Sequence, residues 1–246
     1  MKRLMMHQRL QRLNTCFLRL LLVVLVALGA LVALYFYQGG WEKLQQSRLL
    51  ARVLPGNVIT GPQVAIIAGH RGFDSGAVCE DGTIEALVNE EIADRVARLL
   101  EKEGVAVAVL DEYDPRLEGL QARALVSIHA DSCINQSGFK VASAEQTIIP
   151  QQDALLVSCL KEHYAQATGL AFRASAITRD MTQYHAFQRV ADTTPGAIIE
   201  IGYLGGDRAL LVDEPDRVAE GIARGILCFL DAQPTARATP KDASHP

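Results

Sequence analysis

The sequence predicts an α/β domain of three layers, in which a mostly parallel, twisted sheet carries helices on both faces, preceded by a single transmembrane helix. The first observation is that short apolar runs such as VAIIA at Val64–Ala68 alternate along the chain with segments of helical periodicity. Continuous apolar runs of this length are typical of strands buried on both faces of a parallel sheet. The second observation is an uncharged apolar stretch near the amino terminus.

The amino-terminal stretch predicts a membrane anchor. Residues 20–37 form an uncharged apolar run, and a helix needs about 20 such residues to cross ~30 Å of hydrocarbon. Several Lys and Arg residues precede this run, whereas no Asp or Glu precedes Glu42, so the amino terminus is expected to stay in the cytoplasm. A cleaved signal peptide is the alternative, and both interpretations export the remaining chain. We therefore expect a single-pass protein of the cell membrane with its folded domain outside the cytoplasm.

Changes in charge and hydropathy along the sequence divide the chain into five parts. The expected order is a basic cytoplasmic segment, an anchor, a stalk, a catalytic domain and a disordered polar tail, at residues 1–19, 20–38, 39–62, 63–232 and 233–246. A charged fraction of 21% beside a hydrophobic fraction of 49% is typical of a packed globular protein. Because the exported part is acidic, nucleic acid is excluded as a partner.

Each element of the domain is predicted from its own pattern. Short apolar runs predict strands, at residues 64–68, 105–110, 124–128, 138–144 and 197–201. Helical spacing of apolar residues predicts helices, at residues 85–103, 116–123, 153–168 and 216–232. A glycine-rich loop is expected to join the first strand to the first helix.

Four polar residues fall at or near the ends of these elements. His70 lies two residues after the first apolar run, His129 directly follows another, and Glu85 opens the first helix. Glu200 lies near the end of the last strand-like run. In open parallel sheets, ligands bind beyond the carboxyl ends of the strands, so these side chains are expected to meet there.

Two imidazoles and one carboxylate form a common ligand set for catalytic zinc, which leaves one position for water. His70, Glu85 and His129 are the candidate ligands, and Glu200 is the candidate general base. Spacing alone is a weak signal, since a histidine after a strand is usually a loop residue and Glu85 could simply complement the helix dipole. Glu200 is the most informative, because a carboxylate inside a buried strand is costly without a partner or a function.

Four ordered sequence blocks carry a family resemblance. They are AGHRGFDSGA, the helix-and-strand segment IEALVNEEIADRVARLLEKEGVAVAVL, SIHADS and PGAIIEIGYL, at residues 68–77, 84–110, 127–132 and 195–204. In these blocks the chain resembles the zinc-dependent N-acetylmuramoyl-L-alanine amidases of the amidase 3 family. The resemblance spans about residues 64–230, nearly the whole exported domain.

By position, the resemblance implies roles for the four residues. His70, Glu85 and His129 match the family's zinc ligands, which implies one Zn²⁺ per domain, and Glu200 matches its catalytic glutamate. The implied reaction is hydrolysis of the amide between the lactyl group of N-acetylmuramic acid and L-alanine, with peptidoglycan or muropeptides as partners.

The chain also departs from the family pattern. Arg71 replaces a glycine and is expected to contact an acidic stem peptide or to face solvent, while His185 and Arg189 are expected to face the cleft or to be surface loop residues. Asp74, and less strongly Asp131, are candidates to orient either the glycine-rich loop or a ligand imidazole, from the side of the ring that faces away from the metal. The strand after SIHADS lacks the family's aromatic residues, which leaves the substrate groove open to question.

The cysteines show no paired metal-binding spacing. Cys159 and Cys228 lie in apolar helical patterns and are interpreted as small core residues. Cys79 and Cys133 lie in loops that flank the expected site, where they either remain free or form a disulfide outside the cytoplasm.

Two other functions stay open. One is a wall-binding or regulatory protein on an amidase scaffold that has lost catalysis. The other is a related zinc peptidase or amidase that acts on another exported amide. The presence of all four candidate residues argues against the first of these.

Overall fold

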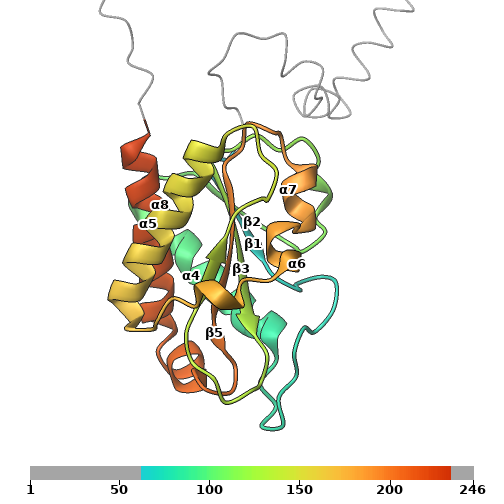
Figure 1. The fold of residues 1–246 in the computed structure, drawn as a ribbon, viewed down its shortest axis with the longest axis vertical. Helices are drawn as coiled ribbons and strands as arrows, with labels where there is room; N and C mark the ends of the chain where they lie inside the picture. Colours follow the sequence, from blue (N-terminus) through green and yellow to red (C-terminus); the bar gives the residue numbers. More distant parts are fainter. Residues whose placement is uncertain (1–61, 234–246) are drawn as a thin grey trace, which may run out of the picture. The chain divides into compact units, whose positions relative to one another are not determined.

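The computed structural model describes residues 62–233 (Figure 1). The expected cytoplasmic segment and anchor therefore lie outside the described residues, as do nearly all of the expected stalk and tail. Among residues 62–233, no helix is both long enough and apolar enough to cross a membrane.

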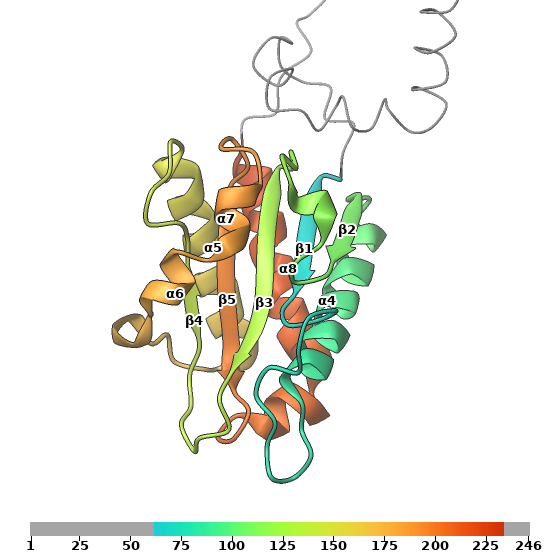
Figure 2. The same ribbon diagram turned by 90° about the vertical axis from the view of Figure 1, so that its right-hand side faces the viewer.

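The centre of the domain is a five-stranded sheet with the order β2-β1-β3-β5-β4 (Figure 2). Its strands are β1 Val64–Ala68, β2 Val107–Leu110, β3 Ala124–Asp131, β4 Lys140–Ala142 and β5 Gly196–Tyr203. The first three and β5 pair in parallel, whereas β4 pairs antiparallel with β5 at one edge. The predicted α/β class with a mostly parallel sheet is confirmed.

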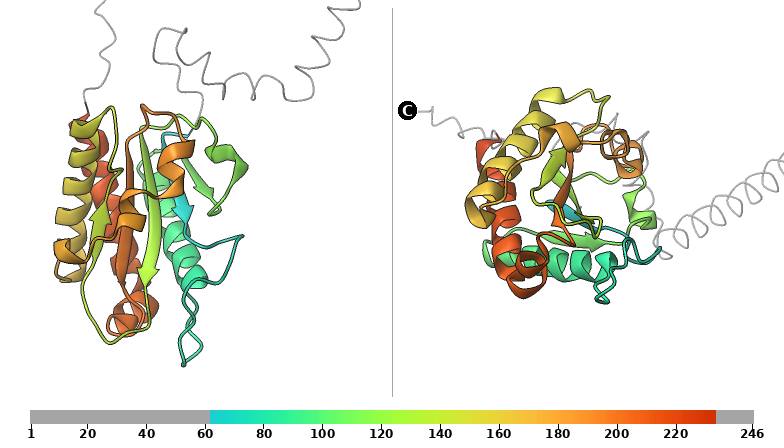
Figure 3. Two further views of the ribbon diagram at one scale, coloured as in Figure 1. Left: turned by 45° about the vertical axis from the view of Figure 1, so that its right-hand side comes forward. Right: turned by 60° about the horizontal axis from the view of Figure 1, so that its bottom comes forward.

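Three long helices, α4 Glu85–Lys102, α5 Pro150–Thr168 and α8 Pro215–Ala232, cover one face of the sheet (Figures 1 and 3). They enclose the larger apolar core, whose fully buried members include Ile66, Val126 and Phe229. Helices α5 and α8 approach closely at Gly225, where an added Cβ would lie only 2.7 Å from the Cα of Leu160.

Cys159 and Cys228 belong to the larger apolar core, as the sequence predicted, but the sequence did not predict that they are bonded to each other. Cys159 is indeed buried, but a disulfide joins it to Cys228 and so links α5 to α8, with the two Cα atoms 5.8 Å apart. Periodicity places each cysteine on the apolar side of its own helix. It contains no information on which helix packs against which, so the pairing was invisible in the sequence.

Within residues 62–233, only short elements cover the other face. They are the 3-10 turns η2 Pro115–Leu117 and η3 Ala174–Ala176 and the helices α6 Arg179–Thr182 and α7 His185–Arg189. A smaller apolar core lies beneath them, around Leu125, Met181 and Ile198. A π-helical turn, η4 Ala209–Asp213, precedes α8. The predicted third layer therefore exists, but it is thin.

Several predicted boundaries differ from the structure. The helix expected at 116–123 is wrong, because Gly119 adopts a positive φ of 69° and ends the turn after η2. The second strand starts later than expected, since the backbone amide of Val105 still bonds the carbonyl of Leu100 in α4. Helix α5 starts three residues earlier than expected, at Pro150, which suits the first helical turn because proline lacks an amide hydrogen.

Candidate metal centre

The predicted ligands meet beyond the carboxyl ends of β1 and β3. His70 lies in the loop after β1, His129 lies near the end of β3, and Glu85 is the first residue of α4. The long loop between β1 and α4 extends past this end of the sheet (Figure 2). His70 is the only non-glycine residue among the described ones with a positive φ, 66°, a conformation that occurs mainly where surrounding contacts impose it.

The three side chains form a compact donor set. Glu85 Oε1 lies 3.1 Å from His70 Nε2 and 3.4 Å from His129 Nδ1, and the potential ligand atoms all lie within 4.8 Å of one another. In a tetrahedral site with bonds of about 2.0–2.1 Å, neighbouring donor atoms are about 3.3 Å apart. The number, chemistry and spacing of these donors fit one zinc ion.

Backbone groups and one amide hold Glu85 in this position. Its Oε2 accepts a hydrogen bond of 2.9 Å from the amide of Ala77, and its Oε1 accepts one of 3.3 Å from that of Ala130. The fully buried Asn89, one turn along α4, donates to both Glu85 Oε1 and the carbonyl of Gly69. Asn89 thus fixes the carboxylate against the His70 loop.

Gly69 is required by the close approach of His129. A Cβ at Gly69 would lie 2.5 Å from His129 Nε2, so any larger residue there would displace the imidazole. The absence of a side chain at Gly69 therefore allows the His129 ring to lie next to the loop that carries His70.

The cluster favours a cation. Burial opposes ionisation of Glu85, but contacts from His129 and His70 outweigh it and hold the pKa of this carboxyl well below its usual range. Burial likewise opposes a charged His129, yet the carboxylates of Glu112 and Glu85 raise its pKa to about 10. Positive charge among these side chains is therefore stabilising, and either protons or a metal ion can provide it.

Asp74 lies where the sequence predicted it, behind a ligand imidazole. Its Oδ1 is 2.5 Å from His70 Nδ1, the ring nitrogen that faces away from Glu85. Asp131 instead forms an ion pair with Lys140 and accepts from the amide of Ser132, so the structure does not place it behind an imidazole.

Glu200 lies beside His129 on the neighbouring strand. In the parallel register of β3 and β5, His129 is the partner of Glu200, and in the antiparallel register of β4 and β5, Lys140 is its partner. All three side chains therefore project from the same face of the sheet. Glu200 Oε2 is buried and has no hydrogen-bond partner in the part of the chain that the structure describes. Burial raises the pKa of this carboxyl, although His129 and Lys140 oppose the shift. A polar atom of this kind is suited to accept a proton from a bound reactant.

Sequence reasoning missed Glu112, a buried carboxylate on the far side of His129. Its Oε2 lies 3.4 Å from His129 Nε2, and its Oε1 lies 2.8 Å from His185 Nε2. Contacts to its neighbours lower its pKa well below the usual range despite burial. A signal was available, since Glu112 follows β2 by two residues, the same offset that singled out His70 after β1.

The three residues predicted to bind substrate are engaged with protein groups. Arg71 Nε lies 2.6 Å from Asp111 Oδ1, and its Nη1 lies 3.8 Å from a Glu90 oxygen. His185, at the start of α7, contacts Glu112, while Arg189 at the end of α7 donates to the carbonyl of Asp114. Their expected contacts with substrate stay predictions.

A disulfide between Cys79 and Cys133 encloses the site, with Cα atoms 5.5 Å apart. The pairing that the sequence left open is therefore present. Cys79 lies in the loop between His70 and Glu85, and Cys133 follows β3, so the bond fastens together the segments that carry the candidate ligands.

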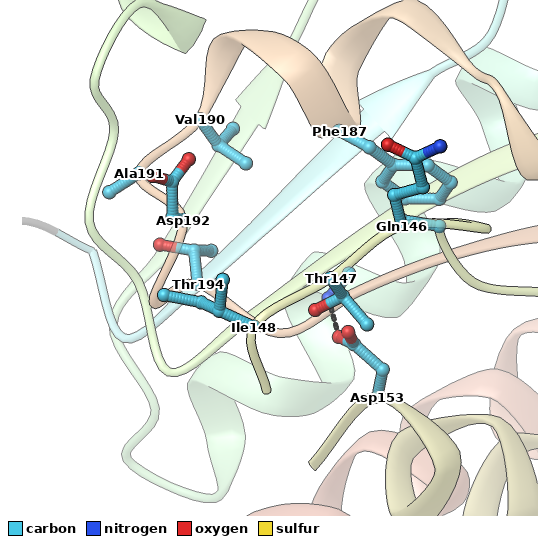
Figure 4. A pocket seen from close by; sticks show the side chains of 11 residues that line it. Gln146, Thr147, Ile148, Asp153, Phe187, Val190, Ala191, Asp192 and Thr194 are labelled. Carbon is cyan, nitrogen blue, oxygen red and sulfur yellow. Dashed lines mark hydrogen bonds between the residues drawn. The ribbon is translucent and has the colours of Figure 1, made fainter. Parts of the chain in front are cut away.

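A separate hollow of about 350 Å³ lies at the opposite end of β5 (Figure 4). Its lining includes Thr147, Phe187 and Gly196. Asp153 Oδ1 in this hollow accepts a 2.9 Å hydrogen bond from the amide of Gly196, so this buried acid caps the start of the strand. The hollow contains none of the candidate metal ligands or Glu200.

A family profile described as N-acetylmuramoyl-L-alanine amidase matches residues 64–228. No curated protein matches the chain significantly.

Several solved structures share the fold. The amidase AmiC2 of Nostoc punctiforme is 28% identical, with a TM-score of 0.53 over 68% of this chain and 96% of its own. The catalytic domain of the amidase CwlV from Bacillus (Paenibacillus) polymyxa var. colistinus is also 28% identical, with a TM-score of 0.52 over 69% of this chain and 98% of its own. The amidase Ami1 from Mycobacterium smegmatis, 21% identical, supports the fold alone, with a TM-score of 0.56 over 72% and 100%.

Proposed function

This chain belongs to the N-acetylmuramoyl-L-alanine amidase family, and we propose that it hydrolyses the bond between N-acetylmuramic acid and L-alanine in peptidoglycan with the help of one zinc ion. The observation that carries the zinc dependence is the donor set of His70, Glu85 and His129, with Glu200 on the adjacent strand. A family member that had lost catalysis would have no need to keep a buried, unpartnered carboxylate beside such a set.

His70, Glu85 and His129 would hold the ion through Nε2, Oε1 and Nδ1, the atoms that face one another. When bound, zinc supplies Lewis-acid chemistry, because it acidifies a water molecule and polarises a carbonyl oxygen. Asp74 orients the His70 ring from behind, and Asn89 and the amides of Ala77 and Ala130 orient Glu85. A rigid donor set of this kind needs little rearrangement during the reaction.

Glu200 is the proposed general base and then general acid. Its carboxylate takes a proton from the attacking water, whose oxygen forms the new bond to the carbonyl carbon. As the carbon–nitrogen bond breaks, Glu200 passes that proton to the departing nitrogen of L-alanine. The products are a free lactyl carboxyl group and a free amino group. The neighbouring Lys140 stabilises the ionised form of Glu200 that the first step requires.

We also place the catalytic domain outside the cytoplasm, held at the membrane by residues 20–38. Two disulfides among the described residues support export, since such bonds persist in oxidising compartments. Peptidoglycan is encountered there, and the anchor would keep the domain close to it.

The test is digestion of purified peptidoglycan by the full-length protein in detergent, with a chelator and then with zinc restored. We expect new L-alanine amino groups and lactyl carboxyl groups to appear, to stop with chelator and to return with zinc. Zinc analysis of the purified protein should give one ion per chain. Binding of muropeptides without new amino groups would favour the regulatory alternative, and cleavage at another amide would favour a related peptidase.

A further inference from the structure

We propose that Glu112 is a positioning residue of the metal centre, whose carboxylate holds both histidine ligands and fixes the ring form in which His129 presents Nδ1 to the ion. The proposal rests on the proposed function only in that a metal binds at His70, Glu85 and His129. It assigns a role to a residue that no sequence argument had singled out.

The contacts of Glu112 join the two ligand segments. Its Oε2 accepts a 2.9 Å hydrogen bond from the backbone amide of His70 and lies 3.4 Å from Nε2 of the His129 ring. The buried Nε2 of His129 makes no hydrogen bond among the described residues, and Glu112 Oε2 is the carboxylate oxygen that faces it. One carboxylate oxygen therefore faces the backbone of one candidate ligand and the side chain of the other.

A metal-binding imidazole must keep its proton on the nitrogen that faces away from the ion. In His129 the nitrogen that faces Glu85 is Nδ1, so Nε2 must carry the proton and requires an acceptor. Glu112 Oε2, at 3.4 Å, is the carboxylate oxygen placed to serve as that acceptor once a metal holds Nδ1. Without the Glu112 carboxylate, nothing in this contact would favour the tautomer of His129 that carries its proton on Nε2 and leaves Nδ1 free for the ion.

The two histidines offer an internal comparison. His70 faces Glu85 through Nε2 and is backed at Nδ1 by Asp74, whereas His129 faces Glu85 through Nδ1 and is backed at Nε2 by Glu112. The Asp74 side chain is 50% exposed and the Glu112 side chain only 7%. Because water can replace Asp74 more readily than Glu112, the His129 side should depend more strongly on its carboxylate.

The other oxygen of Glu112 anchors it to the thin face. Glu112 Oε1 accepts a 2.8 Å hydrogen bond from the Tyr184 hydroxyl and lies 2.8 Å from His185 Nε2. The Ser127 hydroxyl on β3 donates to Tyr184 in turn. Tyr184 and His185, at the start of α7, thereby keep the Glu112 carboxylate against His129. The contact of His185 with Glu112 is thus a structural one.

The test compares zinc affinity and ring form in full-length protein. Glu112→Met removes the acceptor at nearly constant length, and Glu112→Gln keeps one oxygen that can still face His129. Zinc dissociation constants come from competition with a chromophoric chelator. ¹⁵N spectra of histidine-labelled, zinc-loaded protein report which nitrogen of His129 carries the proton and which one binds the ion. Asp111→Asn is the matched control, since Asp111 is the adjacent acid and pairs with Arg71 rather than with an imidazole.

We expect the zinc dissociation constant to rise about 10- to 100-fold in Glu112→Met and by less in Glu112→Gln, with a shift of the His129 proton toward Nδ1. The zinc dissociation constant of Asp111→Asn should stay within about 2-fold of the wild-type value, because this change removes no contact to either imidazole. A wild-type zinc constant and an unchanged proton position in Glu112→Met would overturn the proposal. If Glu112→Met does not fold, Glu112→Ala takes its place, since it also removes the acceptor, and the same result there overturns the proposal. Failure of the wild type to bind zinc would instead refute the proposed function.

Discussion

The two faces of the sheet are built in different ways. One face is covered by α4, α5 and α8, helices of 18 or 19 residues whose contact with the sheet is mainly apolar. The other is covered by elements of three to five residues, and His129, Glu112 and Glu200 lie on that side. Burying charged groups costs free energy that must come from elsewhere in the fold. The comparison teaches that the thick face supplies most of the apolar burial and one candidate ligand, Glu85, whereas the thin face holds the other buried charged groups around His129.

The largest expected effect is on the thin face, in Glu200→Gln. Loss of the proposed base should lower the rate of amide hydrolysis about 10²- to 10⁴-fold. Zinc content should be unchanged, and thermal stability should be equal or higher, because the change removes a buried charge without a hydrogen-bond partner. Peptidoglycan digestion, zinc analysis and thermal unfolding measure the three quantities.

The matched control is Glu101→Gln, because Glu101 is an exposed residue of α4 on the other face of the sheet. It should leave the rate of hydrolysis, the zinc content and the thermal stability unchanged. Wild-type turnover in Glu200→Gln would show that another group takes the proton. Loss of zinc together with activity would show that Glu200 acts through the metal site instead.

An intermediate effect should distinguish the two disulfides. Replacing Cys159 and Cys228 by alanine, or Cys79 and Cys133 by alanine, opens loops of 69 or 54 residues and should reduce the free energy of unfolding by about 2–4 kcal/mol in each case. Only the second pair fastens the ligand segments, so only its loss should also weaken zinc binding. Denaturant unfolding and chelator competition on both variants provide the measurements, and equal zinc affinities would contradict the assigned difference between the faces.

The smallest effect concerns Asp114 on the thin face. Arg116 holds the pKa of this carboxyl below its usual value, so the ionised form stabilises the fold above about pH 4, and this contribution is lost as the pH falls through the lowered pKa. Asp114→Asn should therefore cost about 0.5–1 kcal/mol at pH 7 and progressively less in acid. Urea unfolding of both proteins across this pH range tests the sign. A difference that grows toward acid pH would contradict it.

The sequence predicted the parts of the molecule whose pattern is local. Val64–Ala68 matched the observed strand because a buried strand is continuously apolar, and α4 and α8 were predicted to within a residue of their observed ends. The ligand set came from position relative to strand ends and from family resemblance. The structure brings these residues together at one end of the sheet.

The features that sequence reasoning missed depend on partners distant in the chain. Glu112 lies in an acidic stretch that looks solvated, and only the fold places it against His129 and His185. The Cys159–Cys228 bond depends on which helices pack together. Helices α6 and α7 are too short for periodicity to reveal, since a helical repeat requires several turns.

The close crossing of α5 and α8 has a consequence for engineering. In isolated helices, alanine is favoured over glycine by about 1 kcal/mol, so Gly225 looks like an easy site for improvement. Here the added methyl group would strike the Leu160 backbone, next to the carbonyl of Cys159. The helices would have to separate at the point where their covalent bridge holds them together. A substitution that peptide propensities rank as beneficial is therefore expected to be harmful at this crossing.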